Sequence, residues 1–335
     1  MFENTRVYLA AFADEAPTLD NFGVETVTID GVPDGHLVVK THTLSVDAWI
    51  RTTLSDAGMH SKSPLGQTIR AFGVGEVVAS SSPDWQVGDW AYGTLSAQSH
   101  ALVDASTVKK VHPGNGIEPG AFVGALGITT GLTAWVGLVP VGELADGDTV
   151  LVSGAAGAVG SCVVQIAKAR GARVIGIAGG PEKCAYLTGE TGADVAIDYR
   201  AGDVAAQVAE AAPGGIDLFF DNVGGEILDA ALANLRPEGG ARIAICGAIS
   251  QYENLDDVRG PKLYLRLAER NATMRGFVVS YHAARFPEAI EEISGLIKAG
   301  KLTLREHVVD GVENFPQALL QLYSGGHHGN LVVRA

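Results

Sequence analysis

A glycine-rich turn between an apolar strand and a helical segment carries the clearest chemical signal in the chain. The turn Gly154–Gly160 reads GAAGAVG. Gly157 and Gly160 have the spacing of a dinucleotide-binding fingerprint, with Ala155 at the first glycine position. Such glycines let the backbone approach a pyrophosphate, and the first N–H groups of the helix bind the phosphates. The residues predicted to bind there are Gly157, Ala158, Val159 and Gly160.

The next apolar strand, RVIGIA, ends at Gly179–Gly180, where a site for NAD usually carries an acidic residue that bonds the ribose hydroxyls. Neither glycine repels a 2′-phosphate. Lys183 follows closely, and Tyr199 and Arg200 end the next strand, VAIDYR. A cation and a phenol at this edge favour a 2′-phosphate, so the sequence predicts NADPH as the cofactor. Glu182 is the alternative ribose ligand, and we interpret it as stabilising the start of its helix.

Two kinds of sequence pattern predict the structural elements that position these residues. Residues 1 to about 125 contain short runs of β-branched and aromatic residues, such as VETVTI and HLVVKTHTL, broken by Gly, Pro, Asp and Ser. From 126 to 299 apolar strands alternate with helical segments, which predicts parallel βαβ units. The expected strands are Thr149–Ser153, Arg173–Ala178, Val195–Asp198, Ile216–Asp221, Arg242–Cys246 and Thr273–Val279. The expected helices include Val159–Ala169, Glu182–Thr188, Val204–Ala211 and Phe286–Ala299. β-like runs return at about 300–335, so an α/β domain is inserted in a β-rich domain.

Composition excludes several classes of function. The chain has 335 residues and a net charge of −14, which argues against nucleic acid or an anionic membrane as a partner. No apolar stretch has the roughly 18 residues that a membrane-spanning helix needs. The acidic N-terminus lacks the pattern of a signal peptide, and the three cysteines form no disulfide framework. We therefore expect a cytoplasmic protein.

Motifs spread over nearly the whole chain resemble one enzyme family. They include LSVDAWIR, GVGEVVAS, GLTAWVGL, GAAGAVGS, PEKC, IDYR, FDNVGGEILDAAL, CGAISQYE and GFVVSY, in this order. The chain resembles the zinc-independent medium-chain dehydrogenases/reductases, in the branch of leukotriene B4 12-hydroxydehydrogenase, prostaglandin reductase and curcumin reductase. This resemblance implies a parallel Rossmann sheet for NADP at 126–299, inserted in a GroES-like β-rich barrel domain formed by 1–125 and completed by about 300–335.

The resemblance also implies roles for particular residues. Lys183 and Tyr199 match contacts of the 2′-phosphate, and Asn222 matches a residue that lines the cofactor. Further residues that match cofactor contacts are Cys246, Gly247, Ala248, Ile249 and Ser250, the backbone stretch Phe277, Val278 and Val279 at the nicotinamide amide, and His327. Tyr252 matches a tyrosine at the substrate and the nicotinamide ribose. It is the candidate catalytic residue, as a proton donor or an orienting group, with a loop aromatic packed on the cofactor as the alternative.

The chain departs from the family pattern at four positions. Ala48 and Trp49 stand where the family has a proline and a tyrosine that faces the substrate. His327 stands where an asparagine helps to hold the cofactor, and Asn330 where the family has a lysine. These departures bear on the identity of the substrate more than on cofactor binding.

The predicted reaction needs no metal. The early segment SVDAWI lacks the cysteine of the zinc-dependent relatives, and no Cys, His and acidic residues cluster with a tetrahedral spacing. We predict NADPH-dependent reduction of the C=C bond of α,β-unsaturated ketones or aldehydes by hydride transfer to the β-carbon. The alternatives are a quinone reductase and a non-catalytic NADPH-binding protein. The family resemblance favours a homodimer.

Overall fold

The computed structural model describes residues 1–13, 16–55, 60–252 and 258–335, which form two compact units. Unit 1 comprises Met1–Gly124 and Glu306–Ala335, and unit 2 comprises Ala125–Arg305. The chain therefore leaves unit 1, builds unit 2 and returns to unit 1.

Unit 2 is built on a six-stranded sheet in the order β10-β9-β8-β11-β12-β13, with every neighbouring pair parallel. Its strands are β8 (Thr149–Val152), β9 (Arg173–Ala178), β10 (Val195–Asp198), β11 (Leu218–Asp221), β12 (Arg242–Ile245) and β13 (Thr273–Gly276). The chain runs outward from β8 to β10 and then returns to β11, so the strand order reverses between β8 and β11. In sheets of this kind, ligands bind beyond the carboxyl ends of the strands at such a reversal.

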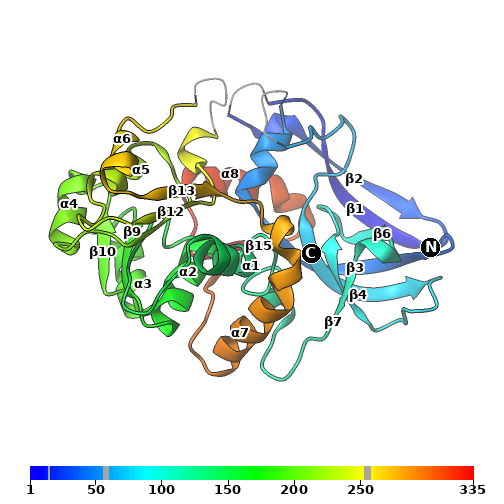
Figure 1. Cartoon of the computed structure of the whole chain (residues 1–335). Helices are drawn as coiled ribbons and strands as arrows, with labels where there is room; N and C mark the ends of the chain where they lie inside the picture. Colours follow the sequence, from blue (N-terminus) through cyan, green and yellow to red (C-terminus); the bar gives the residue numbers. More distant parts are fainter. Residues whose placement is uncertain (14–15, 56–59, 253–257) are drawn as a thin grey trace. The chain divides into compact units, whose positions relative to one another are not determined.

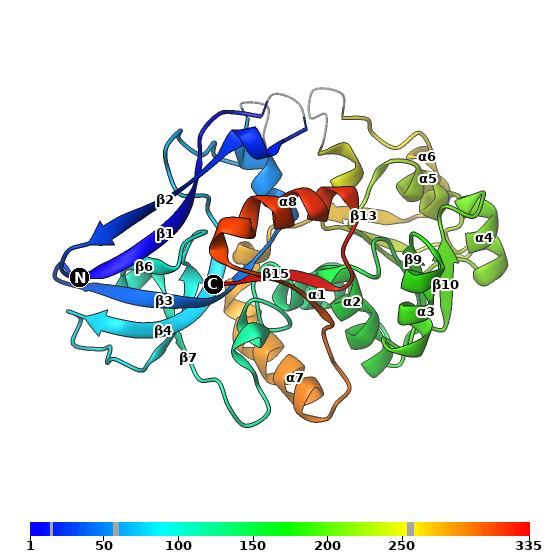
Figure 2. The same ribbon diagram turned by 180° about the vertical axis from the view of Figure 1, so that it is seen from behind.

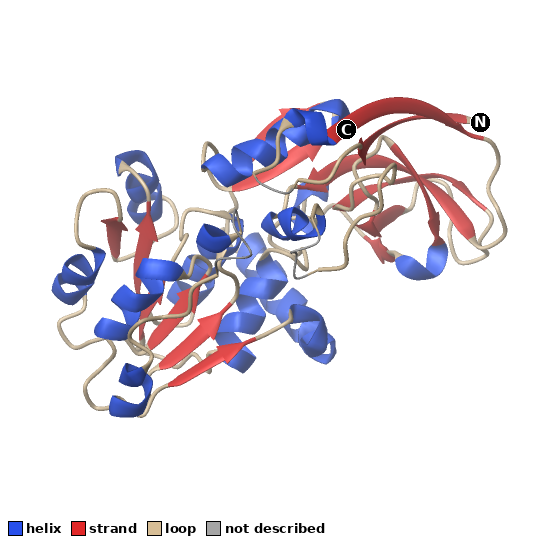
Figure 3. Cartoon of the chain, turned by 90° about the horizontal axis from the view of Figure 1, so that it is seen from above, coloured by secondary structure: helices blue, strands red, loops and turns tan. Residues whose placement is uncertain are grey.

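Helices flank both sides of these parallel strands (Figure 3). They are α1 (Gly131–Val136), α2 (Ala158–Ala169), α3 (Pro181–Gly189), α4 (Val204–Ala211), α5 (Gly225–Ala233), α6 (Leu265–Glu269) and α7 (Phe286–Lys298). Val208 of α4 and Leu232 of α5 pack on Leu151 and Phe219 of the central strands in one buried cluster. Strands covered on both faces need continuous apolar sequence, which explains runs such as TVLV and LFFD.

Unit 1 is β-rich. Its larger sheet has seven strands, in the order β14-β15-β3-β4-β5-β7 with β6 paired to β3. These strands are β3 (His36–Ser45), β4 (Phe72–Ser80), β5 (Trp90–Thr94), β6 (His100–Asp104), β7 (Lys109–Val111), β14 (Glu306–Asp310) and β15 (Asn330–Arg334). β1 (Phe2–Leu9) and β2 (Phe22–Ile29) form a separate antiparallel pair. β15 runs beside β3, with Arg334 opposite Thr43, so the end of the chain completes a sheet begun near its start (Figure 2).

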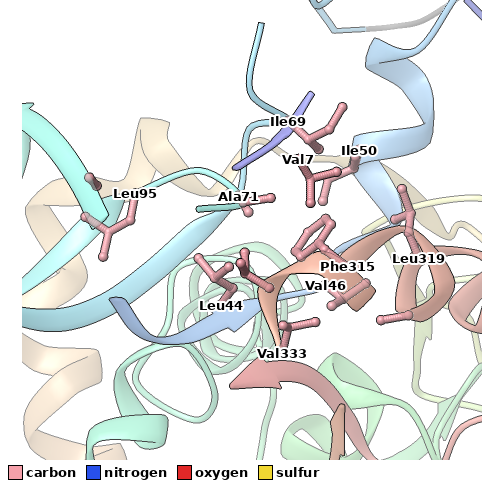
Figure 4. Close-up of a cluster of buried hydrophobic side chains, with 14 of the residues drawn as sticks. Val7, Leu44, Val46, Ile50, Ile69, Ala71, Leu95, Phe315, Leu319 and Val333 are labelled. Atoms are coloured by element: carbon pink, nitrogen blue, oxygen red, sulfur yellow. The ribbon is translucent and has the colours of Figure 1, made fainter. Parts of the chain in front are cut away.

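The core of unit 1 joins segments from both ends of the sequence. Val7 and Leu44 lie in one buried cluster with Phe315 and Leu319 of helix α8 (Phe315–Ser324) and with Val333 of β15 (Figure 4). Each large apolar side chain buried in this way contributes roughly 1.5–3 kcal/mol.

The predicted fold class, an α/β parallel sheet inserted in a β-rich region, is confirmed. Element boundaries differ by a few residues. Ile216, predicted to begin a strand, forms an isolated bridge with Leu235, and β11 begins at Leu218. Among the described residues, no helix has both the length and the apolar character needed to cross a membrane.

Candidate cofactor and active site

The predicted glycine turn leads from β8 into α2, the green helix labelled in Figure 1. Gly157 is the N-cap of α2, and no side chain of the described residues caps the helix there. The Gly157 N–H donates to the Gly154 carbonyl at 3.0 Å, and the Ala155 N–H donates to Ile177 of β9 at 3.0 Å. A Cβ on Gly160 would lie 2.3 Å from the Gly154 oxygen and 2.7 Å from the Ala155 Cα. The turn therefore requires glycine at 160, and it leaves the first N–H groups of α2 open to an anion.

The Gly179–Gly180 pair lies where β9 ends and α3 begins. A Cβ on Gly179 would lie 2.7 Å from Cε1 and 2.8 Å from the hydroxyl of Tyr199, so the Tyr199 ring lies directly on the Gly179 backbone. The structure thus supplies a physical reason for the glycine that replaces an acidic residue. A larger side chain would displace the phenol, which is 43% exposed and accessible to a ligand.

One cation lies beside this phenol, and a second lies near the first. The Arg200 guanidinium lies 5.6 Å from the centre of the Tyr199 ring. Burial lowers the pKa of Lys183, and the neighbouring Arg200 lowers it further, against the opposing effect of Glu182. Two neighbouring positive charges destabilise each other, and a negatively charged ligand bound between them would stabilise both. Residues 183, 199 and 200 therefore form a site suited to a phosphate.

One carboxylate fixes the backbone of this site. Asp198 Oδ1, at the end of β10, accepts the Gly180 N–H at 2.8 Å and the Arg200 N–H at 2.9 Å. These two bonds, that to Gly180 first, lower the pKa of Asp198. The N-cap residue of α3 and the residue after Tyr199 are thus held together before any ligand binds.

The loops after β11 and β12 lie against each other. The Ile249 N–H donates to the Asn222 carbonyl at 3.1 Å, and the Ser250 hydroxyl donates to the Val223 carbonyl at 2.6 Å. The Asn222 amide donates to the Ser153 carbonyl at 2.7 Å. The predicted cofactor residues Asn222 and 246–250 are therefore brought together, with Ser153 of the β8 end beside them.

Tyr252 turns back onto its own loop. Its hydroxyl accepts the Ala248 N–H at 3.3 Å. Burial raises the pKa of the Tyr252 phenol, with smaller contributions from Cys246 and Asp221 in the same direction and from the Ala248 N–H in the opposite direction. The phenol therefore stays protonated at neutral pH, which suits a hydrogen-bond donor and not a base.

Phe277, Val278 and Val279 do not form the end of a strand, and this part of the predicted strand 273–279 is wrong. β13 ends at Gly276, and a 3-10 segment begins at Val279. The Phe277 ring packs edge-on against Phe220, with the ring centres 6.4 Å apart. The chain therefore leaves the sheet after Gly276, and Val278 is 55% exposed.

All four positions at which the chain departs from the family pattern lie in unit 1. His327 lies between α8 and β15. Trp49 lies in the 3-10 segment Ala48–Thr53, and its ring is 5.8 Å from His60 and 6.4 Å from Phe72, measured between ring centres. Burial and the charge of Arg70 lower the pKa of His60, so the imidazole beside Trp49 is neutral at neutral pH.

The predicted residues of unit 2 share one edge of its sheet. Each segment follows the carboxyl end of a strand, and because all the strands are parallel these ends lie at one edge. The glycine turn fits a pyrophosphate, and Lys183, Tyr199 and Arg200 fit a 2′-phosphate beside it. The residues present therefore fit NADPH.

Ser153 was not predicted as a site residue, and the sequence suggests for Asp221 only a cap of the next helix. Both side chains are fully buried at this edge. The Ser153 hydroxyl donates to Asp221 Oδ1 at 2.7 Å and accepts the Asn222 N–H at 2.8 Å. The sequence does contain a feature that could have identified these two residues as part of the site. Each is a polar residue at the carboxyl end of an otherwise apolar strand.

Metal ligation has no evident place in the described part of the chain. Residues 1–13, 16–55, 60–252 and 258–335 contain no group of three His, Cys, Asp or Glu side chains that could hold a metal ion. The thiol of Cys162 is buried, which raises its pKa to about 12 and makes it an apolar packing group.

Comparison with known proteins gives consistent matches over the whole chain. Residues 158–295 match the family model of zinc-binding dehydrogenases, and residues 5–111 match the N-terminal domain of oxidoreductases. A putative NADP-dependent oxidoreductase of Bacillus subtilis is 39% identical over 98% of this chain and 97% of its own length. The NADPH-dependent curcumin reductase of Escherichia coli is 36% identical over 99% of this chain and 96% of its own length. The crystal structure of CurA from Vibrio vulnificus in complex with NADPH superposes with a TM-score of 0.91, at 34% identity over 99% of both chains.

The chain belongs to the medium-chain dehydrogenase/reductase family, and the predicted family is thereby confirmed. Within that family it falls in the branch that contains the curcumin reductases.

Proposed function

We propose that the protein reduces the C=C bond of α,β-unsaturated ketones or aldehydes with NADPH. It is an NADP-dependent oxidoreductase, as its relatives show, and NADPH is its cofactor. The observation that carries the cofactor part of the proposal is the Tyr199 phenol on Gly179 with the Arg200 guanidinium beside it and Lys183 near enough for the Arg200 charge to lower its pKa. Two cations and a phenol match a 2′-phosphate. The curcumin reductase relative supports an unsaturated carbonyl compound as the substrate class.

The chain supplies binding and orientation for this chemistry. NADPH, when bound, supplies the hydride that reduces the β-carbon of the substrate. Negative charge then develops on the substrate carbonyl oxygen, and a hydrogen-bond donor at that oxygen stabilises it. We propose the Tyr252 hydroxyl as this donor. Its oxygen accepts the Ala248 N–H, which fixes its position and leaves its own proton for the substrate.

The catalytic role of Tyr252 has a direct test. Replacing Tyr252 with phenylalanine keeps the ring and removes the hydroxyl, so we expect kcat to fall roughly tenfold, the value of one hydrogen bond. The affinity for NADPH, measured by fluorescence titration, should change less than twofold. Tyr264→Phe is the matched control, because the Tyr264 side chain is 57% exposed and has no role in the proposed site. A kcat that equals that of the unaltered protein would assign Tyr252 to packing alone.

We also propose that catalysis requires no metal. In the part of the chain that the structure describes, no set of side chains could hold a metal ion. Dialysis against a strong chelator is therefore expected to leave the rate of NADPH oxidation by an enone unchanged. Loss of activity that returns on addition of zinc would contradict the metal-free mechanism.

The proposed activity is tested by mixing the protein and NADPH with a panel of enones, enals and quinones and recording the absorbance of NADPH. We expect turnover of enones or enals to saturated carbonyl products, identified by mass spectrometry. Turnover of quinones alone would favour the quinone reductase alternative. Saturable NADPH binding without turnover of any acceptor would favour a non-catalytic NADPH-binding protein.

A homodimer through β13 is a further part of the proposal. β13 is the last strand of its sheet, and all 4 of its residues are exposed. Exposed apolar side chains lie on this strand and just after it, at Met274, Val278 and Tyr281. An open strand edge is a template for pairing with another chain, and two copies related by a twofold axis would each cover the other's edge.

The dimer proposal predicts a molar mass of twice 34.7 kDa by light scattering. Met274→Asp places a charge on the edge and should shift the mass toward the monomer. Leu65→Asp is the control, because Leu65 is 51% exposed and belongs to unit 1. A monomeric mass for the unaltered protein at micromolar concentration would refute the dimer.

We further propose that the protein works in the cytoplasm. Its three cysteines are free, which fits a reducing compartment.

A further inference from the structure

Asp221 ends β11 and is fully buried at the carboxyl edge of the unit 2 sheet. Its Oδ1 accepts three hydrogen bonds, from the Ser153 hydroxyl at 2.7 Å, the Val223 N–H at 2.9 Å and the Gly224 N–H at 3.0 Å. One carboxylate oxygen therefore fixes both the end of β8 and the loop that follows β11.

The main chain of the same residue holds the neighbouring loop. The Asp221 carbonyl accepts the Cys246 N–H at 2.8 Å and the Gly247 N–H at 3.1 Å. Two residues further on, the Val223 carbonyl accepts both the N–H and the hydroxyl of Ser250, at 3.3 Å and 2.6 Å. The donors all come from the loop after β12 and the acceptors from the end of β11 and the loop that follows it. The shape of 246–250 consequently follows the shape of 221–223.

Helix capping alone does not explain this arrangement. α5 has Gly224 as its N-cap, and Asp221 lies three residues before that position. A cap of α5 has no need of the hydrogen bond that Asp221 accepts from Ser153, which belongs to another strand. The carboxylate is costly to bury, since burial raises its pKa against the opposing effects of the Gly224 and Val223 N–H groups and the Ser153 hydroxyl. Within the described residues, Asp221 Oδ2 has no hydrogen-bond partner.

We propose that Asp221 is the positioning residue for the nicotinamide half of the cofactor site. It holds Asn222 and the loop 246–250 in place, and it has no part in the adenosine half formed by residues 179–200. This proposal rests on the proposed function, because it takes NADPH as the ligand. Two carboxylates then hold the backbone of one cofactor site independently. Asp198 holds the adenosine end, and Asp221 holds the nicotinamide end.

The two halves can be separated with two probes. NADPH occupies both halves, whereas 2′,5′-ADP carries only the adenosine and its phosphates. In Asp221→Ala, which removes the acceptor for all three donors, we expect the affinity for NADPH to fall roughly tenfold or more. The affinity for 2′,5′-ADP should stay within twofold of that of the unaltered protein. The affinity for NADH should fall by the same factor as the affinity for NADPH. These affinities are measured by calorimetry, independently of turnover.

Asp221→Asn supplies a second variant that keeps an acceptor oxygen in place. This variant should bind 2′,5′-ADP with unchanged affinity. Its affinity for NADPH should fall by only about threefold, since a neutral acceptor makes a weaker hydrogen bond than a charged one. If Asp221→Ala does not fold, this variant alone carries the comparison of the two probes.

Asp148→Ala is the matched control. Asp148 is also buried in unit 2 and accepts the Ala145 N–H at 2.8 Å and Arg242 Nη2 at 2.9 Å, but it precedes β8 at the opposite end of the sheet. This variant should lose stability and keep its affinity for both probes.

Three results would overturn the proposal: unchanged NADPH affinity in both Asp221 variants, a parallel loss of NADPH and 2′,5′-ADP, or the same selective loss in Asp148→Ala. If the unaltered protein binds neither probe, the proposed function fails together with this inference. If it binds both probes normally and the Asp221 variants show no selective loss, only the inference fails.

Discussion

A variant with alanine in place of Lys183 is expected to bind NADPH roughly 10- to 100-fold more weakly than the unaltered protein, the value of one charge-assisted hydrogen bond. Its affinity for NADH should be unchanged, because NADH lacks the 2′-phosphate. The two affinities are compared by fluorescence titration. Lys298→Ala is the control, since Lys298 is an exposed lysine in the last turn of α7.

The pH dependence of binding gives a second measurement of the same contact. Burial, then Arg200, lower the pKa of Lys183, so its charge is lost at a lower pH than that of an ordinary lysine. The affinity for NADPH should therefore fall as the pH rises into the alkaline range, while that for NADH stays level. Equal affinities of the unaltered protein for NADPH and NADH would contradict the 2′-phosphate site.

Replacing Gly160 with alanine is expected to abolish measurable NADPH binding, a loss of more than roughly 100-fold. The added Cβ would lie 2.3 Å from the Gly154 carbonyl oxygen, and both that oxygen and the nearby Ala155 Cα belong to the backbone. The turn must move to relieve the clash, and the N–H groups that it aims at the pyrophosphate move with it. Overpacking of this kind costs about 1–3 kcal/mol of stability, measured by urea unfolding.

Gly295→Ala is the matched control for this substitution. Gly295 lies inside α7, and a Cβ there would meet no atom of another described element within 4 Å. Alanine should stabilise this helix by about 0.5–1 kcal/mol and leave NADPH binding unaltered. Tight NADPH binding retained by the Gly160→Ala variant would show that the glycine turn does not hold the pyrophosphate.

The alternation of apolar strands and helices was sufficient to predict the parallel sheet, because strands buried on both faces leave an unmistakable apolar signature. The glycine turn was predictable for a related reason. Gly157 and Gly160 are spaced for a backbone that approaches both a phosphate and a strand, and the spacing is visible in the sequence alone.

Other parts of the site depend on long-range contacts that the sequence does not display. Phe277 was expected to continue a strand, yet the strand ends at Gly276 and the Phe277 ring packs on Phe220. Asp221 was interpretable as an ordinary cap, because its contact with Ser153 joins residues 68 positions apart. The reason for glycine at 179 likewise emerges only when Tyr199 of the next strand lies on it.

The pairing of β15 with β3 imposes an order of events during biosynthesis. Thr43 has been synthesised long before its partner Arg334, whereas β13, the last strand of the unit 2 sheet, ends at Gly276. We therefore expect unit 2 to fold on the ribosome while the larger sheet of unit 1 still lacks β14, β15 and the apolar face of α8. During that interval we expect the nascent chain to expose an unpaired strand edge beside an incomplete core, a surface prone to pairing with other chains.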